Sequence, residues 1–144
     1  MDDDLIFMVV DDCETNRVLL KMILDRLFSG CLVLEAENGK QSVEMYTRAI
    51  ESGYKINTIF MDQMMPVMIG STAIRKMCEF HKNTKNKALS KLETKFVIIT
   101  ADQTFKVDNE EDCGSDNFCG NCAVDVFYKP IRKEQIRKIV LGDN

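Results

Sequence analysis

The sequence predicts a doubly wound α/β fold, in which helices cover both faces of a five-stranded parallel sheet. Five short apolar runs alternate along the chain with segments of helical periodicity. The runs are continuously apolar, which is typical of parallel strands buried on both faces. Right-handed crossovers between such strands bring all their carboxyl ends to one edge of the sheet. No internal repeat or linker divides the chain, so we expect one domain over residues 1–144.

The apolar runs and periodic segments place each element in turn. Strands are predicted at 5–10, 31–36, 58–61, 95–100 and 123–128. Helices are expected around 20–27, 43–50, 71–80 and 136–140, each with one apolar stripe. Two polar segments interrupt this alternation. The lysine-rich stretch 81–95 is interpreted as a solvated helix extension or loop, and 102–122 as an extended, weakly helical segment.

The third strand runs directly into a single carboxylate, Asp62. Met65-Pro66 follows, and proline removes a backbone donor and disfavours helix in the residue before it, so the strand must stop near Asp62. Ligands of open α/β sheets bind in the crevice outside the carboxyl ends of the strands. The sequence therefore places Asp62 at the expected position of a functional site.

Four of the five strands end in reactive side chains. These are Asp11-Asp12, Asp62, Thr100 and Lys129. Three carboxylates held together repel one another, and one ammonium group offsets only one of them, so a charge of about -2 remains, which one divalent cation would balance. All-oxygen ligation with few protein donors suits Mg²⁺, which often shares its shell with a phosphate. The alternative is that these acids only solvate the ends of loops.

The same residues suit phosphoryl transfer. A carboxylate can attack phosphorus to form an aspartyl-phosphate, and the reaction needs mainly positioning and charge neutralisation. The only histidine, His81, lies in the lysine-rich stretch rather than at a strand end, so no general base is expected. The site is better suited to receiving a phosphoryl group than to hydrolytic turnover.

Composition narrows the class of protein. With 144 residues, 45% hydrophobic and 29% charged, the chain is that of an ordinary globular domain, and its net charge of -4 argues against nucleic-acid binding. No apolar run is long enough to span a bilayer, and the acidic start is unlike a signal peptide. We therefore expect no membrane partner and a location in the cytoplasm or the nucleus.

The six cysteines are expected to be reduced in such a location. Three of them, Cys113, Cys119 and Cys122, include a C-x-x-C within the extended segment. A zinc site needs four ligands and this segment offers three, so metal binding, redox pairing and free thiols all stay open.

Over essentially its whole length the chain resembles the receiver domain of two-component response regulators, a chemotaxis-regulator-like family. The resemblance rests on Val10-Asp11-Asp12, Phe60-Met61-Asp62 with Met65-Pro66 and Gly70, Ile99-Thr100-Ala101, and Tyr128-Lys129-Pro130, in this order. Asn16-Arg17 and Asn38-Gly39-Lys40 are similar to segments in receivers of hybrid histidine kinases.

The resemblance implies a strand order of 2-1-3-4-5 and a role for each site residue. Asp62 would accept a phosphoryl group from a phosphohistidine on a histidine kinase or a histidine phosphotransfer protein. Mg²⁺, or Mn²⁺ in its place, would be held by Asp12, Asp62 and the backbone carbonyl of Met64, with Asp11 ligating through water. Lys129 would pair with the phosphoryl oxygens, its bond to Pro130 would be cis, and Thr100 would move toward the phosphate. The output partner stays unknown.

The sequence departs from the family pattern at several places. Val126 occupies the switch position three residues before Lys129, where a large aromatic residue is usual, and Phe127 and Tyr128 are expected to point to other faces. Ile69 replaces a usual acid. Met64 and Asp102 stand at positions that modulate dephosphorylation in this family.

Two alternative functions follow from these residues. A degenerate receiver would bind partners without phosphorylation, and Val126 together with the extended segment favours it. An aspartyl-nucleophile phosphatase of the haloacid dehalogenase type would carry a second acid two residues after the nucleophile, where this chain has Met64. We therefore expect a phosphoacceptor domain that is not a turnover enzyme.

Overall fold

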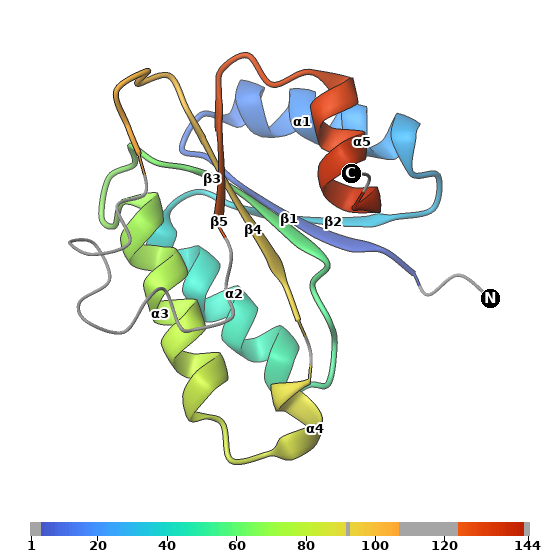
Figure 1. Ribbon diagram of the computed structural model, residues 1–144, viewed down its shortest axis with the longest axis vertical. Coiled ribbons are helices and arrows are strands. Elements are labelled where there is room, and N and C mark those ends of the chain that lie inside the picture. Colours follow the sequence, from blue (N-terminus) through green and yellow to red (C-terminus); the bar gives the residue numbers. More distant parts are fainter. Residues whose placement is uncertain (1–3, 92, 107–123, 143–144) are drawn as a thin grey trace.

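The computed structural model describes residues 4–91, 93–106 and 124–142 (Figure 1). The strands are β1 (Ile6–Val10), β2 (Leu32–Ala36), β3 (Thr58–Asp62), β4 (Lys95–Thr100) and β5 (Val124–Tyr128). The helices are α1 (Glu14–Leu27), α2 (Gly39–Glu51), α3 (Gly70–Asn83), the short α4 (Lys87–Ser90) and α5 (Lys133–Leu141).

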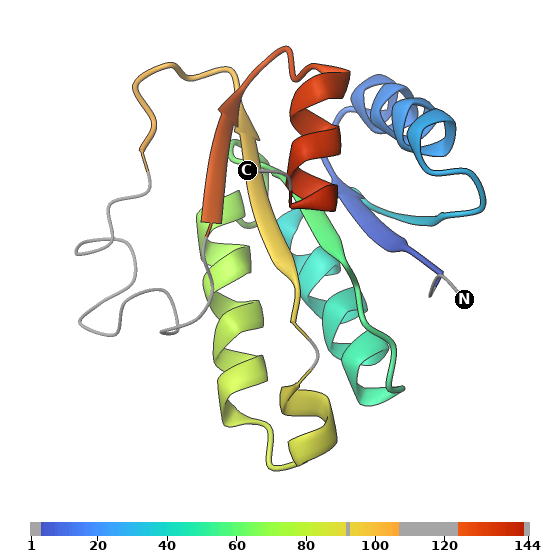
Figure 2. The ribbon, with the colours of Figure 1, turned by 45° about the vertical axis from the view of Figure 1, so that its right-hand side comes forward.

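The five strands form one sheet in the order β2-β1-β3-β4-β5, and every neighbouring pair is parallel. Helices α1 and α5 cover one face, and α2 and α3 cover the other (Figure 2). The doubly wound fold and the strand order 2-1-3-4-5 are both confirmed.

Side-chain alternation along the strands builds two separate apolar cores. In β1, Met8 and Val10 face α2 and α3, whereas Phe7 and Val9 face α1 and α5. Each of the five residues of β3 is buried, because this central strand has a neighbour on each side and helices on both faces. Continuous apolar runs in the sequence therefore correspond to strands covered on both faces.

A local hydrogen bond sets the start of α2, which follows the carboxyl end of β2. The side chain of Asn38 accepts a hydrogen bond from the backbone N–H of Gln41 at 2.8 Å, which caps the helix. Gly39 follows, and a Cβ at this position would lie 2.6 Å from the carbonyl oxygen of Met68. Only glycine lets the β3–α3 connection pass so close to α2.

The observed helix bounds differ from the expected ones at several ends. Helices α1, α2 and α5 begin earlier than predicted, at Glu14, Gly39 and Lys133. Helix α3 continues to Asn83, beyond the predicted end near Phe80, and the lysine-rich stretch contains the single turn of α4. Within the extended segment 102–122, residues 107–122 lie outside the described part of the chain, as do Cys113, Cys119 and Cys122. The described cysteines, Cys13, Cys31 and Cys78, carry thiols outside any disulfide.

In the part of the chain that the structure describes, no helix combines the length and the apolar character needed to cross a bilayer.

Candidate functional site

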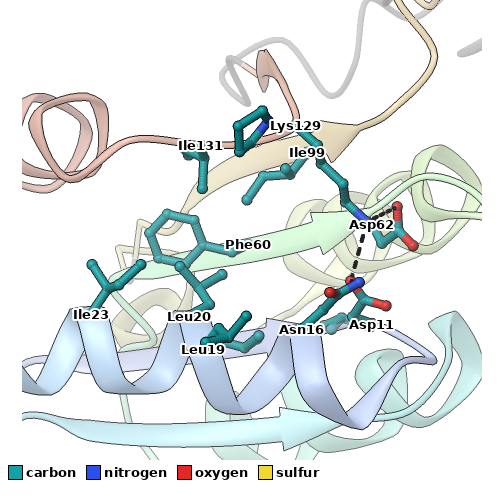
Figure 3. A pocket seen from close by; sticks show the side chains of 13 residues that line it. Asp11, Asn16, Leu19, Leu20, Ile23, Phe60, Asp62, Ile99, Lys129 and Ile131 are labelled. Atoms are coloured by element: carbon teal, nitrogen blue, oxygen red, sulfur yellow. Dashed lines mark hydrogen bonds and ion pairs between the residues drawn. The ribbon is translucent and has the colours of Figure 1, made fainter.

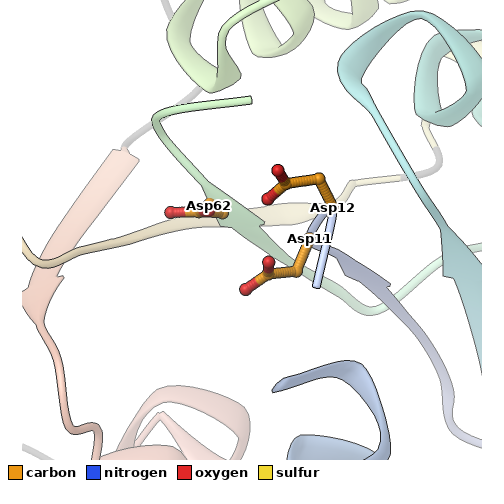
Figure 4. A group of neighbouring side chains, drawn as sticks. All are labelled: Asp11, Asp12 and Asp62. Carbon is orange, nitrogen blue, oxygen red and sulfur yellow. The ribbon is translucent and has the colours of Figure 1, made fainter. Parts of the chain in front are cut away.

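Three carboxylates converge at the carboxyl edge of the sheet (Figure 4). Asp11 and Asp12 follow β1, and Asp62 ends β3, which pairs with β1 as its immediate neighbour. One oxygen from each carboxylate lies within 4.8 Å of the others. The register explains this proximity, because Val10 pairs with Met61 and the next residue of each strand is an aspartate.

Burial and mutual repulsion make this group of acids electrostatically costly. Asp11 is buried and Asp62 is only 9% exposed, whereas Asp12 reaches solvent. Burial first, and then the neighbouring charge of Asp11, raise the pKa of Asp62 above its ordinary value, although Lys129 acts in the opposite direction. The site therefore holds more negative charge than its own residues neutralise.

Lys129 brings one positive charge from the end of β5 (Figure 3). Its Nζ lies 3.4 Å from Asp11 Oδ2 and 3.5 Å from Asp62 Oδ1. Burial alone would lower the pKa of Lys129, but the attraction of the two carboxylates outweighs it, and the pKa is raised. The peptide bond from Lys129 to Pro130 is cis, as the family resemblance implies.

Asp11 is fixed by residues of the β1–α1 connection and of α1. Its carboxylate accepts hydrogen bonds from the backbone N–H of Cys13 at 2.9 Å and from Asn16 Nδ2 at 3.2 Å. Its carbonyl oxygen accepts from Nη1 of the buried Arg17 at 2.8 Å, and Arg17 Nε also lies 3.4 Å from Glu35 Oε1. The sequence shows Asn16-Arg17 only as a family-like pair, and these contacts give both residues a function in holding Asp11.

Thr100 ends β4 and is fully buried beside the acids. In the sheet register it comes one residue after Ile99, which pairs with Asp62. Its Oγ1 accepts a hydrogen bond from the backbone N–H of Asp102 at 3.1 Å, and its carbonyl accepts from the backbone N–H of Lys129 at 2.8 Å. The hydroxyl is therefore placed at the edge that carries the carboxylates.

The expectation about the aromatic residues of β5 is half wrong. Val126 packs against the core on the α2–α3 side, together with Phe105, and Phe127 packs against the opposite core. Tyr128, however, donates a hydrogen bond from its hydroxyl to the carbonyl of Phe105 at 2.9 Å, so it shares the side of Val126. The reason is the two-residue period of a strand, which gives positions 126 and 128 the same face.

The donor set fits a hard divalent cation. Asp11, Asp12 and Asp62 offer oxygen ligands only, and three negative charges offset by Lys129 leave a net charge of about -2. Such a cation would offset the burial and the neighbouring charge of Asp11, which raise the pKa of Asp62. Met64 lies two residues after Asp62 with an exposed side chain, and its carbonyl as a further ligand stays a prediction.

A cavity of about 390 Å³ adjoins the acids on the α1 side of the sheet (Figure 3). Its walls come from α1, from the central strands and from the β5–α5 connection, and they are mostly apolar. Leu19, Phe60 and Ile131 belong to these walls, while Asp11, Asp62 and Lys129 lie at its polar end. Sequence periodicity alone gives no sign of this hollow, because it depends on how α1 and the β5–α5 connection sit on the sheet.

Comparisons with known proteins agree with this geometry. Residues 7–141 match the response regulator receiver domain. The chain is 36% identical over 83 residues to the autoinducer 1 sensor kinase/phosphatase LuxN of Vibrio harveyi, covering 58% of this chain and 9% of LuxN. It is 38% identical over 73 residues to the chemotaxis protein CheY of Halobacterium salinarum, covering 51% of this chain and 55% of that protein. The matched parts thus span well under two thirds of either relative.

Solved structures show the same fold. The chain superimposes on a structure of the Saccharomyces cerevisiae phosphotransfer protein Ypd1 with the receiver domain of Ssk1, with a TM-score of 0.67 at 21% identity, covering 97% of this chain and 88% of that one. A structure of the CheX–CheY complex from Borrelia burgdorferi, with BeF₃ and Mg²⁺, gives a TM-score of 0.66 at 20% identity. The match covers 96% of this chain and 87% of that one. Because the family match spans nearly the whole chain, the protein belongs to the response regulator receiver domains of two-component phosphorelay systems.

Proposed function

We propose that Asp62 is the phosphoacceptor of this receiver domain. The observation that carries the proposal is the position of its buried carboxylate at the end of the central strand, clustered with Asp11 and Asp12 and 3.5 Å from Lys129 Nζ. Lys129 contacts both Asp62 and Asp11, at 3.5 and 3.4 Å. The Asp11 carboxylate, however, is already engaged by the N–H of Cys13 and by Asn16 Nδ2, whereas Asp62, whose pKa is raised, stands at the end of the central strand. It is thus the carboxylate best placed to hold a transferred phosphoryl group beside positive charge.

Asp11, Asp12 and Asp62, with the Met64 carbonyl, would hold Mg²⁺ or Mn²⁺. The bound cation would neutralise charge on the carboxylates and on the phosphoryl oxygens. Asp62 would attack phosphorus through one carboxylate oxygen as the P–N bond of a phosphohistidine breaks, and the imidazole would keep the electron pair. Lys129 would pair with a phosphoryl oxygen, and the Thr100 hydroxyl would donate a hydrogen bond to another.

A histidine kinase or a histidine phosphotransfer protein is the proposed donor, and exposed apolar side chains of α1 supply a docking surface for it. Val18, Leu19 and Met22 are each 44–54% exposed. Leu19 also lines the cavity that ends at Asp62. A donor resting on this surface would therefore lie beside the acceptor carboxylate, and the solved complex of Ypd1 with the Ssk1 receiver supports this class of partner.

We further propose that residues 1–144 act as one signalling domain rather than as a turnover enzyme, in the cytoplasm or the nucleus. His81 is the only histidine, and it lies on α3 outside the acid cluster, so the described site supplies no imidazole base for rapid hydrolysis of an acyl phosphate. A conformational change around Thr100 would pass the signal to an output partner.

Labelling with a small phosphodonor such as acetyl phosphate tests this function. We expect Mg²⁺-dependent addition of one phosphoryl group, mapped to Asp62 by mass spectrometry, and no stable product in Asp62→Asn. Asp125→Asn is the matched control, because it changes an exposed acid within β5 that does not belong to the acid cluster. A label on another residue would contradict the role of Asp62. A protein that takes up no label and binds no beryllofluoride at saturating Mg²⁺ would be a degenerate receiver.

A further inference from the structure

Gln63, the residue directly after Asp62, forms buried hydrogen bonds to the start of α3. Gln63 is buried, and so is Ser71 at the start of α3. Gln63 Nε2 donates to Ser71 Oγ at 3.0 Å, and Gln63 Oε1 accepts from the backbone N–H of Ser71 at 2.9 Å. The carbonyl of Gln63 also accepts from the backbone N–H of Gly70 at 2.9 Å. One residue thus makes three hydrogen bonds to the first turn of α3.

These bonds replace a missing helix cap. The first N–H groups of a helix have no partner within the helix, and they are usually satisfied by the side chain of the residue that precedes it. That residue is Ile69 here, which makes no side-chain cap. Gln63 supplies the acceptor instead, from the end of the strand that carries Asp62.

The same bonds hold together the two ends of the loop between β3 and α3, and further contacts within this loop restrict its backbone. Residues 64–69 lie between the two ends joined by Gln63, and Met68 N–H bonds the Pro66 carbonyl at 2.8 Å inside the loop. A Cβ at Gly70 would collide with the Asp62 carbonyl oxygen, so α3 begins in direct contact with the Asp62 backbone. The loop begins with Met64, whose carbonyl is the fourth ligand in the proposed metal site.

We propose that Gln63 is a positioning residue, which sets the Asp62 carboxylate and the Met64 carbonyl for the metal ion by joining the end of β3 to the start of α3. The proposal rests on the proposed function of the site. An amide is required because Ser71 presents both a donor, its N–H, and an acceptor, its Oγ. Ionised glutamate would lack the donor and add a fourth negative charge beside the cluster, and methionine would lack both groups.

Metal affinity tests the proposal without relying on phosphorylation. Mg²⁺ titration by calorimetry should show binding weakened about 10-fold in Gln63→Met, within the range of roughly 10–100-fold typical when a partner of a metal ligand is lost. Ser71→Ala keeps the backbone bond to Gln63 and should lose less, while Ser71→Thr, which retains the hydroxyl, should bind nearly as the unaltered protein does. Gln135→Met is the matched control, since Gln135 bonds the Arg132 N–H at the start of α5.

The outcomes separate three conclusions. Gln63→Met with unchanged Mg²⁺ affinity and a lower melting temperature would overturn the positioning role and leave Gln63 structural. If Gln63→Met does not fold, equal Mg²⁺ affinities of Ser71→Ala and the unaltered protein would overturn the proposal. An unaltered protein that binds no Mg²⁺ would overturn the proposed function itself. A 10-fold loss in Gln63→Met beside an unaffected Gln135→Met supports the positioning role.

Discussion

The Lys129 ammonium group lies 3.5 Å from the Asp62 carboxylate, although the two residues end strands that are not neighbours. Asp62 ends β3 and Lys129 follows β5, with β4 between them. The lysine side chain therefore reaches across the end of β4, where Thr100 stands. Because Lys129 also pairs with Asp11 at 3.4 Å, one lysine links the end of β5 to the ends of β3 and β1.

Removing this positive charge should strengthen metal binding and weaken phosphorylation. In Lys129→Met, the acids lose the one ammonium group that partly neutralises them, so we expect Mg²⁺ to bind several-fold more tightly, as measured by calorimetry. Labelling by acetyl phosphate should slow, because the phosphoryl oxygens lose their partner. Lys133→Met, at an exposed position of α5, should change neither quantity. Weaker Mg²⁺ binding in Lys129→Met would contradict this electrostatic account.

Without metal, Asp62→Asn should be more stable than the unaltered protein. A carboxyl group whose pKa is raised on folding destabilises the folded state as pH rises above its unfolded pKa, and the full cost is present above the folded pKa. An amide carries no such cost at neutral pH. Melting temperatures in EDTA should therefore rise by a few degrees, since ~1 kcal/mol corresponds to roughly 2–4 °C in a domain near this size.

The pH dependence provides the check on this stabilisation. The difference between Asp62→Asn and the unaltered protein should shrink as pH falls toward the ordinary aspartate pKa, because Asp62 then becomes neutral too. Asp102→Asn should act in the opposite direction, because hydrogen bonds from Thr104 lower the pKa of Asp102. An Asp62→Asn protein that melts below the unaltered one at pH 7 would contradict the prediction.

Val67→Gly should stabilise the protein. Val67 has φ of 72°, a left-handed conformation that costs a residue with a Cβ roughly 1–2 kcal/mol, and its side chain is 74% exposed. Glycine removes that strain, but it adds about 0.5–1 kcal/mol of entropy cost, so we expect a net gain of about 0–1.5 kcal/mol in the free energy of unfolding measured in urea. Val18→Gly, in the regular helix α1, should lose stability in the same assay.

Gly70→Ala should destabilise the protein through crowding. Its Cβ would collide with the Asp62 carbonyl oxygen and lie 2.8 Å from the Met61 side chain, so the start of α3 must move. Such overpacking typically costs about 1–3 kcal/mol, and the displacement should also weaken Mg²⁺ binding. Gly30→Ala is the control that separates crowding at the site from a general loss of stability. Gly30 has φ of 85° with open space around it, so its substitution should lower stability through backbone strain and leave Mg²⁺ affinity unchanged.

Charged residues on α1 should block the protein partner while sparing the chemistry. Leu19→Glu and Met22→Glu place carboxylates on the exposed apolar surface of α1, and we expect phosphotransfer from a phosphohistidine donor to fall at least 10-fold. Labelling by acetyl phosphate should persist, because this small donor needs no docking surface. Lys21→Gln, on the same helix, changes the net charge by the same single unit without adding a carboxylate to the apolar surface. Equal loss with both donors would place the damage in the site itself.

Strand positions and the acid cluster could be predicted from the sequence because each depends on local pattern. A continuous apolar run that ends in a reactive side chain indicates a buried parallel strand, and parallel strands share one carboxyl edge. The Gln63–Ser71 bonds could not be predicted in this way, since they depend on the path of the loop between two residues that are eight positions apart. The contact of Tyr128 with Phe105 depends likewise on a separate segment.

Helix α1 carries two sets of residues with separate tasks. Asn16 and Arg17 hold Asp11 from within, whereas Leu19 and Met22 are open to solvent. In the proposed function, exchange of the outer residues would change recognition between pathways, while the inner pair would keep Asp11, a proposed metal ligand, in place. Partner choice and cation loading would then depend on different residues of one helix and could be adjusted separately.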